Sequence, residues 1–299
     1  MQIRAATRGS ALARWQTAHI ASLIDSTTRA TVEPVVVSTA GDRDKVTPLH
    51  EIGGKGVFVK EVQAAVLDGR ADIAVHSAKD LPALTPDGLT ICAVPARADA
   101  RDALVGCRLD DLPHGALVGT GSIRRQVQLV ALRPDLELVE IRGNIDTRLS
   151  YVKANGGELD AVVMASAALD RLDIHPAVVD RISIDTMLPQ VGQGTLAIEC
   201  RSDDVETHQL LSSIDDPVAH RLLDAERAFL VELGGDCDLP AGAFATLDVG
   251  STGNEADTRV VVRAMLSNGD DVVFVDSASG FDGVAIGHGL AVDLRSRLV

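Results

Sequence analysis

The chain lacks a surplus of basic residues, a long apolar run and any closely spaced pair of cysteines. Its 43 acidic residues outnumber its 28 lysines and arginines, which gives a formal net charge of -15 at pH 7. This balance argues against a nucleic-acid binder, because neutralising phosphates requires a basic face. No run approaches the roughly 18 apolar residues of a membrane-spanning helix, and no apolar signal segment follows Met1. We therefore expect a cytoplasmic protein that binds neither nucleic acid nor membranes.

The four cysteines are far apart in the sequence, at Cys92, Cys107, Cys200 and Cys237. There is no CxxC pair, so the pattern predicts neither a zinc site nor a disulfide framework, and we expect no metal. Cys92 and Cys200 lie in apolar, strand-like runs and are expected to be inert core residues. Cys237 differs, because glycines, acidic residues and a proline surround it in residues 233–242 and should hold its thiol near the surface.

The length and the alternation of apolar segments predict the fold class. A chain of 299 residues with 46% hydrophobic content can form two or three domains with their own cores. Buried strands alternate with amphipathic helices, and the last segment has the pattern of three strands and a helix. We expect two similar α/β lobes with a double hinge crossover, like periplasmic binding proteins, plus a small C-terminal α/β domain with a three-stranded sheet. The expected domains are residues 1–95 with 190–213, residues 96–189, and residues 214–299.

Polar residues follow the predicted strand at residues 73–75 closely. A buried strand at residues 73–75 leads into His76, Ser77, Lys79 and Asp80. Ligands bind at the carboxyl ends of strands in open α/β sheets, so Lys79 and Asp80 are candidates for a charged pair in a cleft. A solvated loop before the following proline is the alternative.

A helix amino end is predicted after the first strand. Ser10 is expected to cap a helix there, which puts Arg8 and Ser10 where unpaired N–H groups and the helix dipole favour anions.

Six arginines lie in strand-to-helix turns or first helical turns of this acidic chain. Arg124 and Arg125 begin a predicted helix over residues 123–132, where positive side chains oppose the helix dipole. An anion bound by the helix N–H groups and both guanidinium groups would explain them. We expect all six to converge on one sheet edge, around a ligand with several carboxylates or phosphates. The six are Arg8, Arg124, Arg125, Arg142, Arg148 and Arg171.

Five motifs in order along the chain resemble those of the porphobilinogen deaminase (hydroxymethylbilane synthase) family. They are ATRGSALA (6–13), GGKGVF (53–58), AVHSAKD (74–80), GTGSIRR (119–125) and VGQG (191–194). The resemblance implies a monomeric transferase of tetrapyrrole (haem) biosynthesis. Such an enzyme condenses four porphobilinogen molecules, with loss of ammonia, to hydroxymethylbilane. The resemblance also implies a dipyrromethane cofactor that is joined to Cys237 by a thioether.

The resemblance assigns roles to the residues already singled out. Asp80 would hydrogen-bond pyrrole N–H groups and stabilise the cation that is left when the amine departs. The arginines would bind acetate and propionate groups, and Phe58 would stack over the site. The other expected binding residues are Ser10, Lys55, Ser77, Lys79, Thr120, Ser122 and Gln193.

Two positions depart from the family pattern. Gly121 stands where a serine is common, and Asp236 precedes the cysteine where glycine is usual. The first departure removes a hydroxyl donor, and the second affects the conformation of the cysteine loop and the acidity of its thiol.

Two other classes of function fit parts of the pattern. A two-lobed binding protein for a small anion would share the hinge architecture, but it would not need Cys237 and would usually carry an export signal. A phosphate-transfer enzyme could use the glycine loops. Against this class, no Ser or Thr follows Lys55 at P-loop spacing, and the sequence has no acidic metal cluster.

Overall fold

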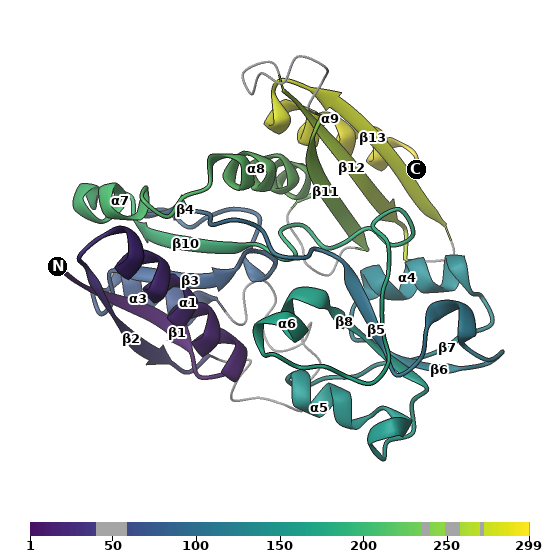
Figure 1. The fold of residues 1–299 in the computed structure, drawn as a ribbon. Helices are drawn as coiled ribbons and strands as arrows, with labels where there is room; N and C mark the ends of the chain where they lie inside the picture. The colour runs from purple at the N-terminus through teal and green to yellow at the C-terminus, as the bar shows by residue number, and fades with distance from the viewer. Residues whose placement is uncertain (40–58, 235–239, 249–257, 270–271, 299) are drawn as a thin grey trace. The chain divides into compact units, whose positions relative to one another are not determined.

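The computed structural model describes residues 1–39, 59–234, 240–248, 258–269 and 272–298. The chain divides into two compact units, Met1–Ala98 with Thr195–Arg221, and Asp99–Gly194 with Leu222–Val299. Figure 1 shows helices and strands mixed along the chain, with two sheets of five strands and one sheet of three. This confirms the predicted mixed α/β class with a small three-stranded sheet.

In the sheet of the first unit, four strands run in the same direction and one, β10, runs in the opposite direction. Its order is β2 (Thr31–Val37), β1 (Gln2–Arg8), β3 (Ile73–Ser77), β10 (Leu196–Arg201) and β4 (Leu89–Ala93). β1 is parallel to β2 and β3, whereas β10 is antiparallel to β3 and β4. The carboxyl ends of β1 and β3 therefore lie at the same edge of the sheet.

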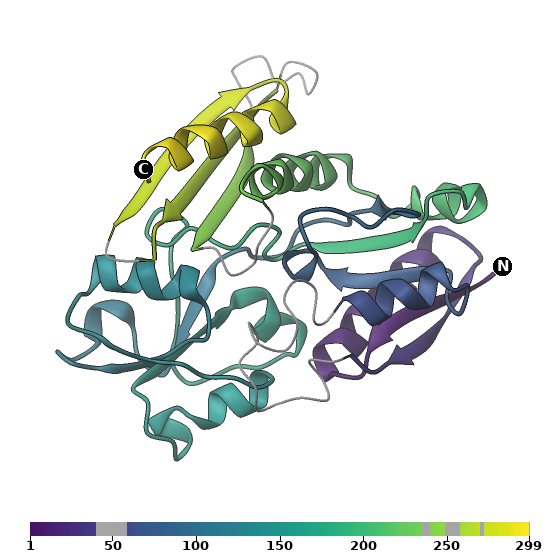
Figure 2. The same cartoon turned by 180° about the vertical axis from the view of Figure 1, so that it is seen from behind.

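Helices cover both faces of this sheet because its strands alternate apolar side chains between the faces. On one face, α1 (Ala11–Thr27) and α7 (Val205–Leu211) pack their apolar residues into a shared core with β1, β3 and β10. On the other face, α3 (Lys60–Leu67) packs against β1 and β3. The reverse view in Figure 2 brings α3 in front of the sheet.

The five-stranded sheet of the second unit repeats the parallel arrangement. Its order is β7 (Glu137–Val139), β6 (Leu117–Gly119), β8 (Ala161–Ala165), β5 (Asp102–Val105) and β9 (Val179–Arg181). β6 is parallel to β7 and β8, and β5 is antiparallel to β8 and β9. The helices that follow the parallel strands are α4 (Ile123–Leu132), α5 (Ile145–Ser150) and α6 (Ser166–Arg171).

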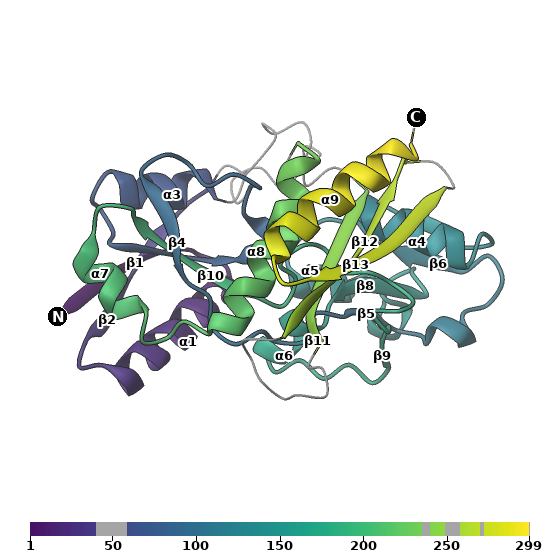
Figure 3. The same ribbon diagram turned by 90° about the horizontal axis from the view of Figure 1, so that it is seen from above.

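The three-stranded sheet is antiparallel and also belongs to the second unit. Its strands are β11 (Ala241–Asp248), β12 (Arg259–Ser267) and β13 (Val273–Gly280). The helices α8 (Pro217–Glu232) and α9 (Gly283–Ser296) share its core. Figure 3 shows α9 lying over β12 and β13. The helices approach closely because α9 has Gly287 at the contact, where a Cβ atom would lie 2.2 Å from the carbonyl oxygen of Ala225.

Several sequence predictions agree with these elements. The predicted helix over residues 123–132 matches α4. Asp216–Pro217 is also a helix-start signal in the sequence, and Asp216 caps α8 by accepting hydrogen bonds from the N–H groups of Val218 and Ala219. The three sheets draw on the ranges of the three expected domains, but the second and third sheets form one compact unit. The three-domain division therefore stays a prediction. Among the described residues, no helix has the length and apolar composition of a bilayer-spanning segment.

Cys92 and Cys200 lie in strands, and Cys200 is buried in the core, as predicted, but the prediction that they form no disulfide is wrong. The two residues form a disulfide, with their Cα atoms 6.4 Å apart. Cys200 of β10 pairs with Thr90 of β4, and Cys92 follows two residues later on the same face of the sheet. The sequence gives no spacing signal for this bond, because 108 positions separate the two cysteines and only the strand pairing brings them together.

Candidate active site

The first unit holds a pocket at the carboxyl ends of β1 and β3, which we call the Asp80 pocket. Its volume is about 50 Å³. It brings Asp80 together with three other predicted site residues, Arg8, Ser10 and Ser77. The complete lining is Arg8, Ser10, Leu12, Ala13, Gln16, Val59, Val62, Val75, His76, Ser77 and Asp80.

The backbone around Asp80 fixes the position of this carboxylate. The strand β3 ends at Ser77 and continues into one 3-10 turn, η1 (Ala78–Asp80). The N–H of Ala78 donates to the carbonyl oxygen of Thr195 at 3.0 Å, and the N–H of Leu81 donates to that of Ala78 at 3.2 Å. Ala78 and Leu81 are both buried, whereas Asp80 is half-buried. The acid is therefore held by anchored neighbours and reaches the pocket.

The turn from β1 into α1 supplies the cationic side of the pocket. Ser10 caps α1, and its hydroxyl accepts a hydrogen bond from the N–H of Ala13 at 3.3 Å. This confirms the predicted cap. Arg8 and the first turn of α1 consequently line the same pocket, and the free N–H groups of a helix amino end favour an anion there.

Two polar residues of the pocket lining, Gln16 and His76, are absent from the sequence prediction of the site. Gln16 of α1 is buried, and its Nε2 donates to the hydroxyl of Ser77 at 2.7 Å. His76 is buried beside it in the pocket wall. The sequence offers one signal for Gln16, a polar residue that falls between Ala13 and Ile20 on the buried face of α1.

In the second unit, three predicted binding residues meet one buried acid, Asp102 of β5. Arg124 Nη2 donates to Asp102 Oδ2 at 2.8 Å, and Arg125 Nε and Nη2 donate to Oδ1 at 3.0 and 2.8 Å. Gln193 Nε2 donates to the same Oδ1 at 2.9 Å. Asp102 is fully buried.

The charges of this cluster compensate one another. Burial raises the pKa of Asp102, but the charges of Arg124 and Arg125 and the hydrogen bond from Gln193 outweigh it and hold that pKa well below its ordinary range. Burial lowers the pKa of Arg124. A protein anion, Asp102, thus explains two arginines at the start of α4 without a ligand. The predicted contact of these arginines with a bound anion stays a prediction.

The segments that follow β7 and β8 carry the other predicted arginines, Arg142 in a loop, Arg148 in α5 and Arg171 in α6. Nη1 of Arg142 is buried and has no hydrogen-bond partner among the described residues. Arg148 Nε donates to the carbonyl oxygen of Gly143 at 3.0 Å. Arg171 Nη2 donates to that of Gly194 at 2.8 Å, and burial lowers the pKa of Arg171 to about 10. Arg171 ends α6 instead of beginning it.

The loop between β6 and α4 explains the glycine at position 121. Thr120 is fully buried, and its hydroxyl accepts a hydrogen bond from the N–H of Ser122 at 3.2 Å. A Cβ atom on Gly121 would lie only 2.6 Å from the carbonyl oxygen of Ile141. This loop and the segment after β7 approach too closely for a serine at position 121 without a backbone shift.

The six arginines do not share one sheet edge. Arg8 ends β1 in the sheet of the first unit, whereas the other five lie in helices or a loop that follow strands of the five-stranded sheet of the second unit. Lys79 lies half-buried in η1 but does not line the Asp80 pocket. Lys55, Phe58 and Cys237 lie outside the described residues.

A family model named "Porphobilinogen deaminase, dipyromethane cofactor binding domain" matches residues 3–209, which is more than half of the chain. The chain belongs to the porphobilinogen deaminase family. This family builds hydroxymethylbilane in tetrapyrrole biosynthesis. The porphobilinogen deaminase of Roseiflexus sp. (strain RS-1) is 45% identical over 292 residues, covering 96% of this chain and 94% of its own. That of Brevibacillus brevis is 42% identical, covering 97% of this chain and 93% of its own.

Two solved structures that were compared are weakly similar to this chain. An ancestral cationic amino acid solute binding protein has a TM-score of 0.43 at 14% identity, covering 71% of this chain and 88% of its own. A putative methionine-binding lipoprotein from Bacillus subtilis has a TM-score of 0.41 at 13% identity, covering 73% and 92%. These similarities add nothing to the family assignment.

Proposed function

We propose that this chain is a transferase that carries a dipyrromethane cofactor on Cys237 through a thioether. It condenses four porphobilinogen molecules, with loss of ammonia, to hydroxymethylbilane. The observation that carries the proposal is the Asp80 pocket, in a chain whose residues 3–209 match the cofactor-binding domain of the family. We also propose a cytoplasmic monomer that binds neither nucleic acid nor membranes, in keeping with its net charge of -15.

The second unit has cations that suit a bound polycarboxylate. Each pyrrole of a dipyrromethane carries an acetate and a propionate group. Nη1 of Arg142 is buried without a partner among the described residues, and the pKa of Arg171 is lowered by burial. The Arg142 guanidinium would gain from a carboxylate, because a buried donor without a partner is costly. Arg171 already donates to Gly194, and a carboxylate would offset the cost of burying its charge. Thr120 and Ser122 lie in the loop after β6, and Arg148 lies in α5, which follows the parallel strand β7; these three residues would complete the binding set.

The surroundings of Cys237 in the sequence also support attachment in the second unit. Gly242, five residues later, is the second residue of β11 and lies against the Arg124 side chain, since a Cβ atom there would lie 3.2 Å from Arg124 Cδ. Five residues span at most about 17 Å. Cys237 is therefore tied to a strand that touches the Arg124–Asp102 cluster. When bound, the cofactor would supply a nucleophilic pyrrole carbon from which the product chain grows.

The Asp80 pocket would act on the incoming porphobilinogen. Arg8 and the amino end of α1 at Ser10 would bind its carboxylates by charge and by hydrogen bonds. Asp80 would accept a hydrogen bond from the pyrrole N–H and balance the positive charge that develops as the carbon–nitrogen bond breaks and ammonia leaves. Ser77 is oriented by Gln16, and Lys79 next to Asp80 adds positive charge for a further carboxylate.

The apolar side of the pocket would help the same chemistry. Leu12, Val59 and Val62 also line it and would keep water away from the reacting carbon. Exclusion of water strengthens the interaction between Asp80 and the developing cation.

Intact-mass measurement of the denatured protein tests the attachment. We expect a mass above the sequence mass by two linked pyrrole units, and its loss in Cys237→Ser. Cys107→Ser is the matched control and should keep the added mass. Incubation with porphobilinogen should then yield the linear tetrapyrrole. An active protein with the bare sequence mass would refute the covalent cofactor, and a modified but inactive protein would refute the assigned reaction.

A further inference from the structure

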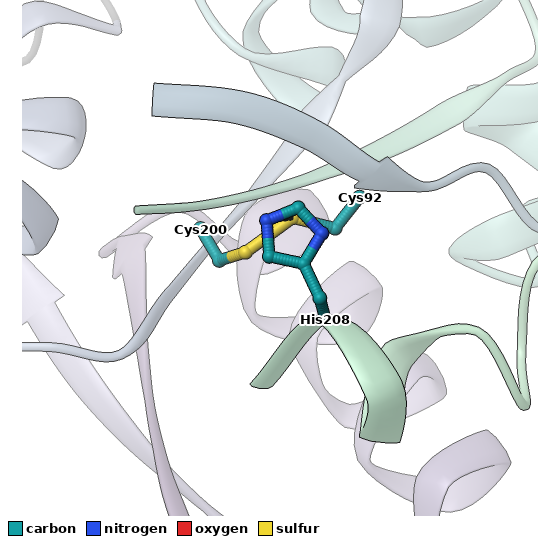
Figure 4. Close-up of side chains that lie close together, drawn as sticks. All are labelled: Cys92, Cys200 and His208. Carbon is teal, nitrogen blue, oxygen red and sulfur yellow. Dashed lines mark hydrogen bonds between the residues drawn. A yellow bond between two sulfur atoms is a disulfide. The ribbon is translucent and has the colours of Figure 1, made fainter. Parts of the chain in front are cut away.

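A second cluster of reactive side chains lies in the first unit, and none of its members lines the Asp80 pocket. It consists of Cys92 in β4, Cys200 in β10 and His208 in α7 (Figure 4). The two cysteines form a disulfide, and Nε2 of His208 lies 3.7 Å from Sγ of Cys92. The ligand atoms of all three residues lie within 4.8 Å of one another.

The two sulfur atoms of the cluster differ in their accessibility. Cys200 is fully buried in the core between the sheet and α1, whereas Cys92 and His208 are half-buried. Ile91 and Ala93 pair with the adjacent residues Glu199 and Ile198, so Cys92 is the extra residue of a β-bulge. A bulge re-aims the side chain of the extra residue, and it keeps the Cys92 sulfur at the rim of the core beside α7.

We propose that Cys92 and Cys200 form a reversible redox site that exchanges with small-molecule thiols and disulfides, with His208 as the proton acceptor of Cys92. In the reductive direction, an external thiolate attacks Sγ of Cys92, because that sulfur is the more exposed one. The bond between the two cysteines breaks, and Cys200 leaves with the electron pair and takes up a proton.

A second external thiolate then attacks the outer sulfur of the mixed disulfide and releases Cys92. In sum, two external thiols become one disulfide, and the protein disulfide gains two electrons and two protons. Oxidation is the reverse: His208 accepts the Cys92 proton, the thiolate attacks an external disulfide, and Cys200 displaces the second external thiolate.

The bond has a structural consequence for the sheet. It ties β4 to β10, and β10 pairs on its other side with β3, which leads to Asp80. A crosslink between residues 108 positions apart restricts the unfolded chain strongly. We therefore expect the oxidised protein to melt roughly 5–10 °C higher than the reduced protein.

The full-length protein, equilibrated in glutathione buffers of different oxidation state, tests the proposal. Free thiols are trapped with N-ethylmaleimide, and the peptides are identified by mass. We expect the peptides of Cys92 and Cys200 to change together from doubly alkylated to disulfide-linked, with a matching rise in melting temperature. Cys107→Ser should behave like the wild type, whereas Cys92→Ser and Cys200→Ser should each melt at one temperature in all buffers.

Two results would overturn the site. Both cysteines could remain fully alkylated in oxidised glutathione, with no change in melting temperature. Alternatively, the purified protein could contain one equivalent of zinc that protects both thiols, which would make the three residues a metal site instead.

The role of His208 has its own measurement. In the reduced protein at pH 7, alkylation of Cys92 by iodoacetamide should be about threefold slower in His208→Ala for each unit by which the pKa of the thiol rises, because lost thiolate is partly offset by higher nucleophilicity. Free imidazole should restore part of that rate. An unchanged alkylation rate in the variant would remove His208 from the site.

Discussion

Nε2 of His76 lies 3.1 Å from Oε2 of Glu199, and both side chains are almost completely buried. Gln63 Nε2 donates to both carboxylate oxygens of Glu199, at 3.1 and 2.9 Å. Although His76 Nε2 is close to the carboxylate, it is not aligned for a well-formed hydrogen bond with any described residue. Glu199 lies in β10, which pairs with β3, the strand that leads to Asp80. Its carboxylate lies beside the imidazole of His76, which lines the Asp80 pocket.

Glu199→Gln should lower the turnover number about tenfold, because the substitution keeps the shape of the side chain but removes the charge beside His76. The rate of hydroxymethylbilane formation at saturating porphobilinogen measures this effect, and KM should change much less. Glu206→Gln on the exposed side of α7 is the control and should retain the wild-type turnover number. Equal turnover numbers for the two variants would show that Glu199 does not act through His76.

Asp80→Asn should reduce the turnover number by at least about a hundredfold, because an amide cannot balance the positive charge that develops when ammonia leaves. The fold should persist, since the backbone bonds at Ala78 and Leu81 do not involve the carboxylate. Single-turnover kinetics and circular dichroism measure the two effects. Asp110→Asn, at an exposed position, is the matched control. An Asp80→Asn enzyme with near-normal turnover would remove Asp80 from the chemistry.

Caps, helices and strands that are set by residues close together in the sequence could be predicted well. The Ser10 cap, the bounds of α4 and the strand at Ala161–Ala165 follow from local patterns of apolar and capping residues, and the structure has all three. The position of Asp80 at a sheet edge could also be predicted, because parallel strands put their carboxyl ends at one edge of the sheet.

Features that depend on strands from distant parts of the chain could not be predicted. Asp102 is the first residue of β5, and its burial is decided by β5 pairing between β8 and β9. The disulfide of Cys92 and Cys200 and the contact of Gln16 with Ser77 likewise join residues that no local spacing connects. Arg8 follows a strand of one sheet and the other five arginines follow strands of another. This could not be predicted, because the sequence pattern does not say which sheet a strand joins.

Asp102→Asn should destabilise the second unit by roughly 3–5 kcal/mol, because the buried guanidinium groups of Arg124 and Arg125 would lose their counter-charge. Urea unfolding followed by circular dichroism measures the change. Asp135→Asn, which breaks the more exposed pair with Arg133, is the control and should have a much smaller effect. Similar destabilisation in both variants would argue against a special role for the Asp102 cluster.

Acid should destabilise the second unit between about pH 4 and pH 2. Burial raises the pKa of Asp99, but hydrogen bonds from Arg101 and Arg181 outweigh it and lower that pKa to about 2 from its ordinary 3.8. A carboxyl group with a lowered folded-state pKa contributes stability above its unfolded-state pKa, and this contribution is lost as the pH falls through the folded-state value. Asp102 shifts in the same direction.

Urea midpoints measured from pH 7 to pH 2 should therefore stay level down to about pH 4 and then decrease. In Asp99→Asn the decrease should be shallower, because one of the linked carboxyl groups is gone. An identical pH profile for the variant and the wild type would show that Asp99 does not contribute to the acid response.

Arg142→Gln should weaken the binding of pyrrole carboxylates more than it weakens the fold. Nη1 of Arg142 is buried and has no partner among the described residues, so its removal breaks no protein hydrogen bond at that atom. It would, however, remove a charged donor for a ligand, a loss of about 1.5–3 kcal/mol, or roughly tenfold to more than a hundredfold in affinity. The variant should accordingly need more porphobilinogen for half-maximal rate and should accumulate shorter pyrrole chains, which native mass spectrometry resolves.

Arg133→Gln is the matched control for Arg142→Gln, because the Arg133 guanidinium already pairs with Asp135 at 2.8 Å and carries no role in the proposed site. It should retain the wild-type dependence on porphobilinogen. The melting temperature of Arg142→Gln should stay within a few degrees of the wild type, since the lost group was unpaired. A large drop in melting temperature with unchanged substrate dependence would make Arg142 a structural residue and would leave the carboxylates to Arg148 and Arg171.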